Sequence, residues 1–209
     1  MHIIDALKWR YATQKFDTNK DIPEETLTEI LTAGNLAATA YGLQPFEMMV
    51  VKDRVIKERL IPASYGQEHA GYNSALIVFA TRTDIDEAFI GEYVDRLADA
   101  RQLPADVAEG IKNTMNGDLG NRTPENRAHW AANQAFIALG TVMAAASEAE
   151  VDNHAMLGFD PDQYDEILGL KEYNLHATVI LALGYRAPDD AWQHYPKVRK
   201  DLEDIVKKI

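Results

Sequence analysis

Three basic residues near the two ends of the chain have types and spacing that could hold an anionic group. Arg10 precedes small and hydroxyl-bearing residues, and Lys197 and Arg199 are separated by one residue near the C-terminus. If residues 196–200 are extended, Lys197 and Arg199 project from one face of the segment and Val198 from the other. Cations grouped in this way suit one phosphate group, although ordinary surface bases have the same appearance in a sequence.

The composition restricts the class of partner. The 209 residues, of which 46% are hydrophobic and 9% aromatic, suffice for one medium-sized domain with a real core. The net charge of −12 and the pI near 4.9 argue against nucleic acids and anionic membranes as partners. The chain has no cysteine, which excludes disulfides and thiolate nucleophiles. No secretory signal pattern opens the chain, so we expect a cytoplasmic protein.

Several other kinds of site are not indicated by the sequence. The six histidines are scattered, without an H-E-x-x-H motif or a histidine pair four residues apart, so we expect no metal site. No P-loop and no G-x-S-x-G elbow is present. A G-x-G-x-x-G fingerprint after a strand is also absent, which argues against a Rossmann pyrophosphate site. A site for a single phosphate monoester remains, and this fits FMN but not FAD.

The elements that must position the bases alternate between helices and strands. Apolar runs predict strands at 47–51, 75–80, 152–156 and 177–183, and helices at 22–34, 55–60, 84–103, 104–116, 125–150 and 161–168. The pattern indicates one α+β layered domain over residues 1–209. Residues 84–120 form a helical excursion that could act as a lid, and residues 115–120, with two glycines, are expected to be a mobile loop.

The longest predicted helix runs from Glu125 to Glu150 and begins after Pro124, which fits a first helical turn. Between residues 131 and 146 it is apolar nearly all round, yet it is too short for a membrane span and carries two amides. A helix buried on all sides is the better interpretation. Both a monomeric core and an obligate dimer built around this helix are compatible with its many small residues.

Five separated segments, in this order along the chain, resemble the FMN-dependent nitroreductase family. They are Arg10 to Phe16, Ala38 to Phe46, Ala75 to Ala80, Asn153 to Asp160 and Pro196 to Arg199. No single segment is specific to the family. The resemblance depends on all five occurring together, in the family's order, over nearly the whole chain. The resemblance implies a nitroreductase-like fold, with a central mixed β-sheet flanked by helices and a long buried central helix. It also implies an intertwined homodimer with FMN at the subunit interface.

The resemblance further implies which residues bind the cofactor. Arg10, Lys197 and Arg199 keep the family's basic residues at the phosphate. Gln14 stands where many relatives have Lys or Arg near the N1–C2=O edge of the flavin, and Leu157 supplies the main-chain amide that the family directs at flavin N5. The other implied positions are Tyr11, Ala12, Ala38, Thr39, Ala40, Gly66, His69, Ala155, Met156 and Gly158. Among these, residues 38–40 correspond to a loop that reaches the partner's flavin, and Gly66 and His69 to positions near the pyrimidine.

The activity implied by the resemblance is hydride transfer from NADH or NADPH to flavin N5. Two electrons then pass to a nitroaromatic, quinone or similar acceptor by a ping-pong scheme. The flavin carries this chemistry, so no side chain is expected to act as catalytic acid or base. Two alternatives remain open at this point: an FMN-binding module for storage or sensing without turnover, and an acidic structural protein without a ligand.

Overall fold

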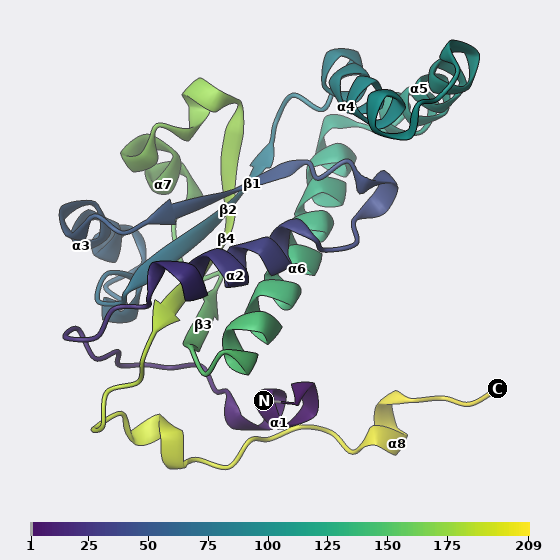
Figure 1. Cartoon of the computed structure of the whole chain (residues 1–209). Helices are drawn as coiled ribbons and strands as arrows, with labels where there is room; N and C mark the ends of the chain where they lie inside the picture. The colour runs from purple at the N-terminus through teal and green to yellow at the C-terminus, as the bar shows by residue number, and fades with distance from the viewer. Residues whose placement is uncertain (1) are drawn as a thin grey trace.

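The structure, a computed structural model, describes residues 2–209 and is built on a four-stranded antiparallel sheet (Figure 1). The strands are β1 (Phe46–Val51), β2 (Ala75–Arg82), β3 (Asp152–Met156) and β4 (Leu175–Gly184), arranged in the order β1-β2-β4-β3. The expected α+β architecture and all four predicted strands are confirmed. The sheet is not mixed, however, because every strand pair is antiparallel.

Helices cover both faces of the sheet, and the two-residue period of β2 explains how. Even-numbered residues of β2 pack with α3 (Arg54–Ala63) and α7 (Pro161–Leu168), whereas odd-numbered residues pack with α2 (Glu24–Asn35) and α6 (Pro124–Glu148). Residues 75–81 are all buried, which confirms the prediction of a strand covered on both faces. The two apolar clusters therefore fix the central strands β2 and β4, and β4 in turn holds the edge strand β3.

Two further helices, α4 (Glu87–Arg101) and α5 (Ala105–Gly120), pack on each other beyond the end of the sheet (Figure 1). The prediction of a mobile loop at residues 115–120 is wrong, because α5 continues through them. Met115 and Leu119, one helical turn apart, are both buried, and their burial outweighs the low helix propensity of the glycines. The role of residues 84–120 as a lid stays a prediction.

The long helix α6 begins as predicted with a proline in its first turn, and the side chain of Thr123 accepts a hydrogen bond from the amide of Asn126. Its burial differs from the prediction. Phe136 and Ile137 are 39% and 44% exposed, and Gly140 beside them is also exposed. The expectation that α6 is buried on all sides is therefore wrong for the single chain, which leaves one apolar stripe uncovered.

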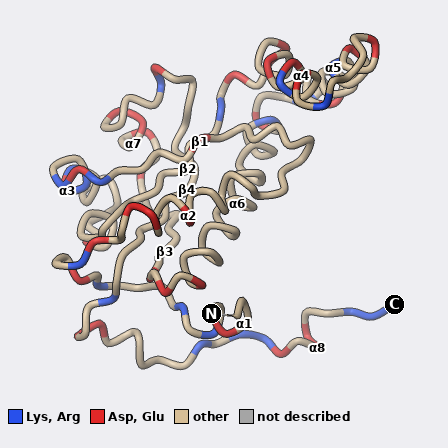
Figure 2. The backbone as a smooth tube through the Cα atoms, viewed as in Figure 1, with Lys and Arg blue, Asp and Glu red and all other residues tan. Residues whose placement is uncertain are grey.

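The two chain ends meet beside β3. Helix α1 (Ile3–Trp9) lies along a C-terminal tail that contains η4 (Ala191–His194) and α8 (Leu202–Ile205) (Figure 1). Figure 2 shows the basic stretch of this tail passing α1 and the segment that follows it. Short 3-10 helices complete the fold: η1 (Ala40–Gly42), η2 (Glu68–Ala70) and η3 (Leu170–Tyr173). Within residues 2–209, no helix combines the length and the hydropathy that a membrane span requires.

Candidate functional site

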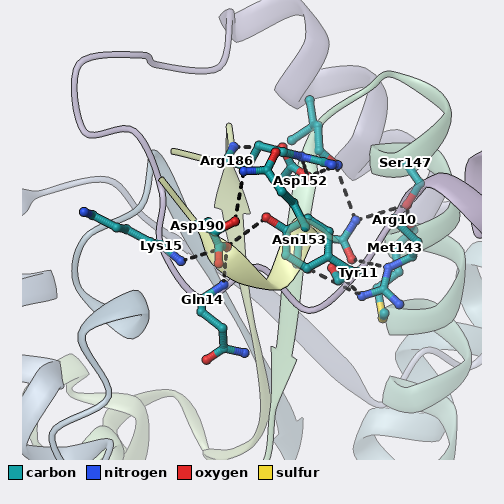
Figure 3. Close-up of polar contacts among 12 residues, drawn as sticks. Arg10, Tyr11, Gln14, Lys15, Met143, Ser147, Asp152, Asn153, Arg186 and Asp190 are labelled. Atoms are coloured by element: carbon teal, nitrogen blue, oxygen red, sulfur yellow. Dashed lines mark hydrogen bonds and ion pairs between the residues drawn. The ribbon is translucent and has the colours of Figure 1, made fainter. Parts of the chain in front are cut away.

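Arg10 is held against β3 by a chain of hydrogen bonds that leads into α6. Its Nε donates to Asn153 Oδ1 at 3.0 Å, and Asn153 Nδ2 donates to Ser147 Oγ at 3.1 Å (Figure 3). Ser147 Oγ in turn donates to the Met143 carbonyl within α6. Ala12 pairs with Asn153 in an isolated parallel bridge, the only parallel pairing in the part of the chain that the structure describes. The segment after α1 is thus an extra strand-like edge on β3.

The three predicted cations come together at the end of α1. Lys197 Nζ donates to the carbonyl oxygens of Leu7 and Arg10, as a lysine does near a helix C-terminus. Burial, followed by repulsion from Arg10 and Arg199, lowers the pKa of Lys197, and burial and Arg199 likewise lower the pKa of Arg10. Residues 196–200 belong to no hydrogen-bonded strand. The extended residues Tyr195 and Asp201 flank them, and the alternation of side chains within 196–200 stays a prediction.

The protein neutralises the charge of this cluster only in part, through the negative charge of Asp152 near Arg10. Among residues 2–209, none of Arg10, Lys197 and Arg199 forms an ion pair within 4 Å of a carboxylate. In a chain of net charge −12, such a grouping of like charges costs free energy unless an anion balances it. The cluster therefore fits a doubly charged phosphate group.

A buried carboxylate, Asp190, fixes the segment that follows Arg10. Its Oδ2 accepts from the Tyr11 hydroxyl at 2.8 Å and from the amides of Gln14 and Lys15 at 3.0 and 3.2 Å (Figure 3). Its Oδ1 accepts from the Trp192 amide at 3.0 Å, and the residue is only 1% exposed. Burial alone would raise the pKa of Asp190, but the bonds from Tyr11 and these amides outweigh it and leave the pKa below its ordinary value.

A second clamp ties the same segment to the sheet. The main-chain amide and Nε of Arg186 donate to the two carboxylate oxygens of Asp152, each at 2.8 Å. The Arg186 guanidinium also lies 4.3 Å from the ring centroid of Trp9 and 4.7 Å from that of Tyr11. Burial and the bond to Asp190 raise the pKa of Tyr11. The Tyr11 side chain is therefore part of the scaffold, and cofactor contact at this position is left to its main chain.

The loop before β2 reaches the end of β3. Gln67 Nε2 donates to the Gly158 carbonyl at 2.6 Å, and a Cβ added at Gly158 would lie only 2.9 Å from the same nitrogen. Gly66 has φ +78°, a conformation that favours glycine. The predicted positions in and beside β3 differ in exposure: Met156 is in the core at 4%, whereas Leu157 is 66% exposed. Met156 can therefore offer a ligand only its main chain.

His69 brings this loop against the segment after α1. Its ring stacks on that of His154 in β3, with centroids 4.2 Å apart, and His154 Nδ1 lies 2.9 Å from the carbonyl oxygen of Thr13. His69 Nε2 is buried without a hydrogen-bond partner among residues 2–209. Such a group costs about 1–3 kcal/mol. This atom points to a polar ligand that the chain itself does not supply.

Residues 38–40 are not brought to this place within one chain. They follow α2 at the opposite end of the molecule from α1, where the amide of Ala40 donates to Gln134 Oε1 of α6 at 2.8 Å (Figure 1). Gln14 is in the site, but its Nε2 donates to the Ala12 carbonyl at 3.0 Å, and Figure 3 shows its side chain directed away from Asp190. The structure thus groups the predicted residues 10–14, 66–69, 155–158 and 197–199 and separates 38–40.

Sequence reasoning missed the residues that hold the site together, namely Asp190, Arg186, Asn153 and His154. Asn153 and His154 lie inside a segment that carried the family resemblance, so they were available as candidates. Asp190 accepts from the amide two residues later, a local capping pattern, but its contact with Tyr11 spans 179 residues. No local signal in the sequence could have identified that contact.

Comparisons with known proteins identify the family of this chain. The model of the Nitroreductase family matches residues 7–185. The chain is 33% identical, over 98% of its length and 96% of the relative, to a Bacillus subtilis protein assigned as the NAD(P)H nitroreductase YfkO. It is 31% identical to the major NAD(P)H-flavin oxidoreductase of Aliivibrio fischeri, over 98% and 97% of the two chains.

A solved structure from Exiguobacterium sibiricum, assigned as a nitroreductase in complex with FMN, has a TM-score of 0.86 and 21% identity, and the match covers 100% of this chain and 98% of that one. A Bacillus subtilis structure assigned as the nitroreductase ydfN has a TM-score of 0.88 and 20% identity, with 99% and 98% covered. These two likenesses concern the fold. Taken with the family match over most of the sequence, they place the molecule: this chain belongs to the nitroreductase family.

Proposed function

We propose that this chain binds FMN beside β3 and uses it to pass electrons from NADH or NADPH to a small-molecule acceptor. The observation that carries the proposal is the cluster of Arg10, Lys197 and Arg199, which forms no ion pair within 4 Å of a carboxylate among residues 2–209. A phosphate monoester brings nearly two negative charges, and charge-assisted hydrogen bonds to it are worth about 1.5–3 kcal/mol each. The relatives named for NAD(P)H and flavin, and the fold neighbour with FMN, support the same ligand.

The residues of this chain would bind and orient the flavin, which when bound supplies hydride acceptance and two-electron transfer. Arg10, held by Asn153, and Lys197, held by the end of α1, fix the phosphate. The main chain at Leu157 is proposed to orient the flavin atom that accepts hydride. Gln14, which is neutral, would leave the pyrimidine edge without a fixed positive charge beside it.

Donor and acceptor would occupy the same flavin face in turn, which is a ping-pong scheme. Nitroaromatics, quinones and similar two-electron acceptors are the proposed second substrates. An FMN-binding module without turnover is the rival, and the two are separated by mixing the FMN-loaded protein with NADH or NADPH without oxygen. Rapid loss of the flavin absorbance supports the oxidoreductase, and retention of the absorbance for hours supports the binding module.

We further propose that the working form is a homodimer with FMN at the subunit interface. The exposed stripe of Phe136, Ile137 and Gly140 on α6 is an apolar surface that a second copy would cover. Residues 38–40, far from Arg10 in one chain, would then lie near the partner's flavin. Analytical ultracentrifugation should show a dimer with two flavins at nanomolar concentration. A monomer that keeps its FMN would refute this assembly.

The phosphate assignment is tested with two neighbouring bases. Arg199→Gln should weaken FMN binding by about tenfold, the effect of losing roughly 1.4 kcal/mol, and should leave riboflavin binding nearly unchanged. Lys200→Gln removes the same charge one residue later, where an extended chain faces the other way, and should affect neither ligand. Titration of flavin fluorescence gives both dissociation constants. Equal losses for FMN and riboflavin would exclude Arg199 from the phosphate site.

A further inference from the structure

His69 and His154 form one unit at the meeting point of three chain segments. His69 lies in η2 and is 8% exposed, His154 lies in β3, and their rings are nearly parallel, with 9° between the planes. His154 Nδ1 contacts the Thr13 carbonyl oxygen, which adds the segment after Arg10. The pair therefore belongs to the wall of the proposed cofactor site, yet hydride transfer as described above assigns it no role.

The protein leaves hydrogen-bonding capacity of this unit unused. His69 Nε2 has no hydrogen-bond partner among residues 2–209, although it is buried. The great majority of buried polar side-chain atoms in proteins are hydrogen-bonded. Each atom that is not calls for a ligand, a water or a functional reason. An imidazole nitrogen differs from a hydroxyl because it can also take up a proton.

Each neighbouring element contributes to the charge state of the pair. Burial, then the proximity of His154, lowers the pKa of His69 to about 4, against a weaker opposing effect of Asp190. Burial also lowers the pKa of His154, and the positive charge of Arg10 lowers it further. The hydrogen bond between His154 and Thr13 and the negative charge of Asp190 act in the opposite direction, but the pKa stays below its ordinary value. On α3, which packs on η2, the Lys57 ammonium is occupied by main-chain oxygens of residues 73 and 74. The pair is consequently neutral at neutral pH.

We propose that the His69–His154 pair is a proton acceptor that takes up one proton from water whenever the bound flavin gains two electrons. This inference rests on the proposed function. The donor gives up a hydride, that is two electrons and one proton, and leaves as NAD⁺ or NADP⁺. One negative charge would remain on the flavin, and the proton taken up on the free nitrogen of the pair, His69 Nε2, would balance it. When the acceptor takes the hydride, this proton supplies the second hydrogen, so the pair returns to neutrality.

The pair would take up a proton on reduction because a negative charge then appears beside two imidazoles in a poorly solvated place. A negative charge within about 4–6 Å raises the pKa of a cationic acid by about 1–3 units, more where water is excluded. That increase carries an imidazole from a pKa of about 4 to one between about 5 and 7, and higher where water is excluded. His154 is partly exposed, which gives the proton a path from water. The pair therefore changes its protonation state only when the charge of its ligand changes.

The test is the pH dependence of the midpoint potential of the FMN-loaded protein, measured by spectroelectrochemistry. Each proton taken up with two electrons lowers the potential by about 30 mV per pH unit. With the pair as acceptor, one proton goes to the flavin and one to the pair for every two electrons. The potential should then fall by about 59 mV per pH unit between about pH 5.5 and pH 7. His69→Gln keeps a polar side chain that cannot titrate there, and its slope should fall to about 30 mV. His129→Gln, at an exposed position on α6, should retain the parent slope.

A second measurement needs no variant at the pair. Histidine-labelled FMN-loaded protein, followed by NMR, should show an imidazole that titrates well below pH 6 when the flavin is oxidised and near or above pH 7 when it is reduced. Identical titration in both states, or equal slopes for the parent and a His69→Gln protein with bound FMN, would overturn this inference alone. Failure of the parent chain to bind FMN would overturn the proposed function and the inference together.

Discussion

Replacing Asp190 tests whether one buried carboxylate determines the shape of the cofactor site. Asp190→Ala removes the acceptor of four hydrogen bonds, including those from the amides of Gln14 and Lys15. The Tyr11 hydroxyl can turn toward water, but the three amides, of Gln14, Lys15 and Trp192, are fixed in the main chain. At about 1–3 kcal/mol for each unsatisfied donor, the loss in the free energy of unfolding should be about 3 kcal/mol. For a chain of this length, that corresponds to a fall in Tm of roughly 6–12 °C.

Asp189→Ala is the matched control, since the Asp189 side chain is exposed and its ion pair is with the exposed Lys15 side chain. It should leave both stability and FMN affinity unchanged. Urea denaturation of the flavin-free protein gives the stabilities, and fluorescence titration gives the affinities. The pKa of Asp190 lies below its ordinary value, so its contribution persists above about pH 4 and fades as the pH falls further; the parent and the variant should then converge. Equal stability of the two variants at neutral pH would refute the role of Asp190.

Two further predictions concern the flavin itself. Gln14→Lys should raise the midpoint potential of bound FMN, because a cation near the pyrimidine stabilises the negative charge gained on reduction; an unchanged or lower potential with intact FMN affinity would mean that position 14 does not face that edge. Leu157→Ala should retain most flavin reduction by NADH or NADPH, whereas Leu157→Pro, which lacks the amide hydrogen, should slow it by about ten- to a hundredfold in anaerobic stopped-flow experiments. Parent-like reduction of a Leu157→Pro protein with bound FMN and an unaltered circular dichroism spectrum would exclude the amide at 157.

Where local patterns and tertiary packing agree, the sequence was sufficient. The apolar run at residues 75–80, the strand at 152–156 and the helix at 161–168 appear where period and capping predicted them. Local pattern and tertiary packing disagree at residues 115–120, where the glycines indicated a loop but the burial of Met115 and Leu119 maintains α5. The burial of α6 was also misjudged, because hydropathy identifies apolar faces but not whether this chain or another covers them.

The sequence by itself determined the fold class, the family and the three basic residues that group at the end of α1, because these depend on residue type and short-range order. Only the tertiary structure decided how the site is held. Arg10 meets Asn153 across 143 residues and Tyr11 meets Asp190 across 179. The stack of His69 on His154 likewise joins distant segments. Such contacts arise when burial of the two sheet faces brings β3, the end of β4 and the chain ends together, and the free energy of that burial is spread over the whole core. No local residue pattern encodes which distant donor will find which acceptor.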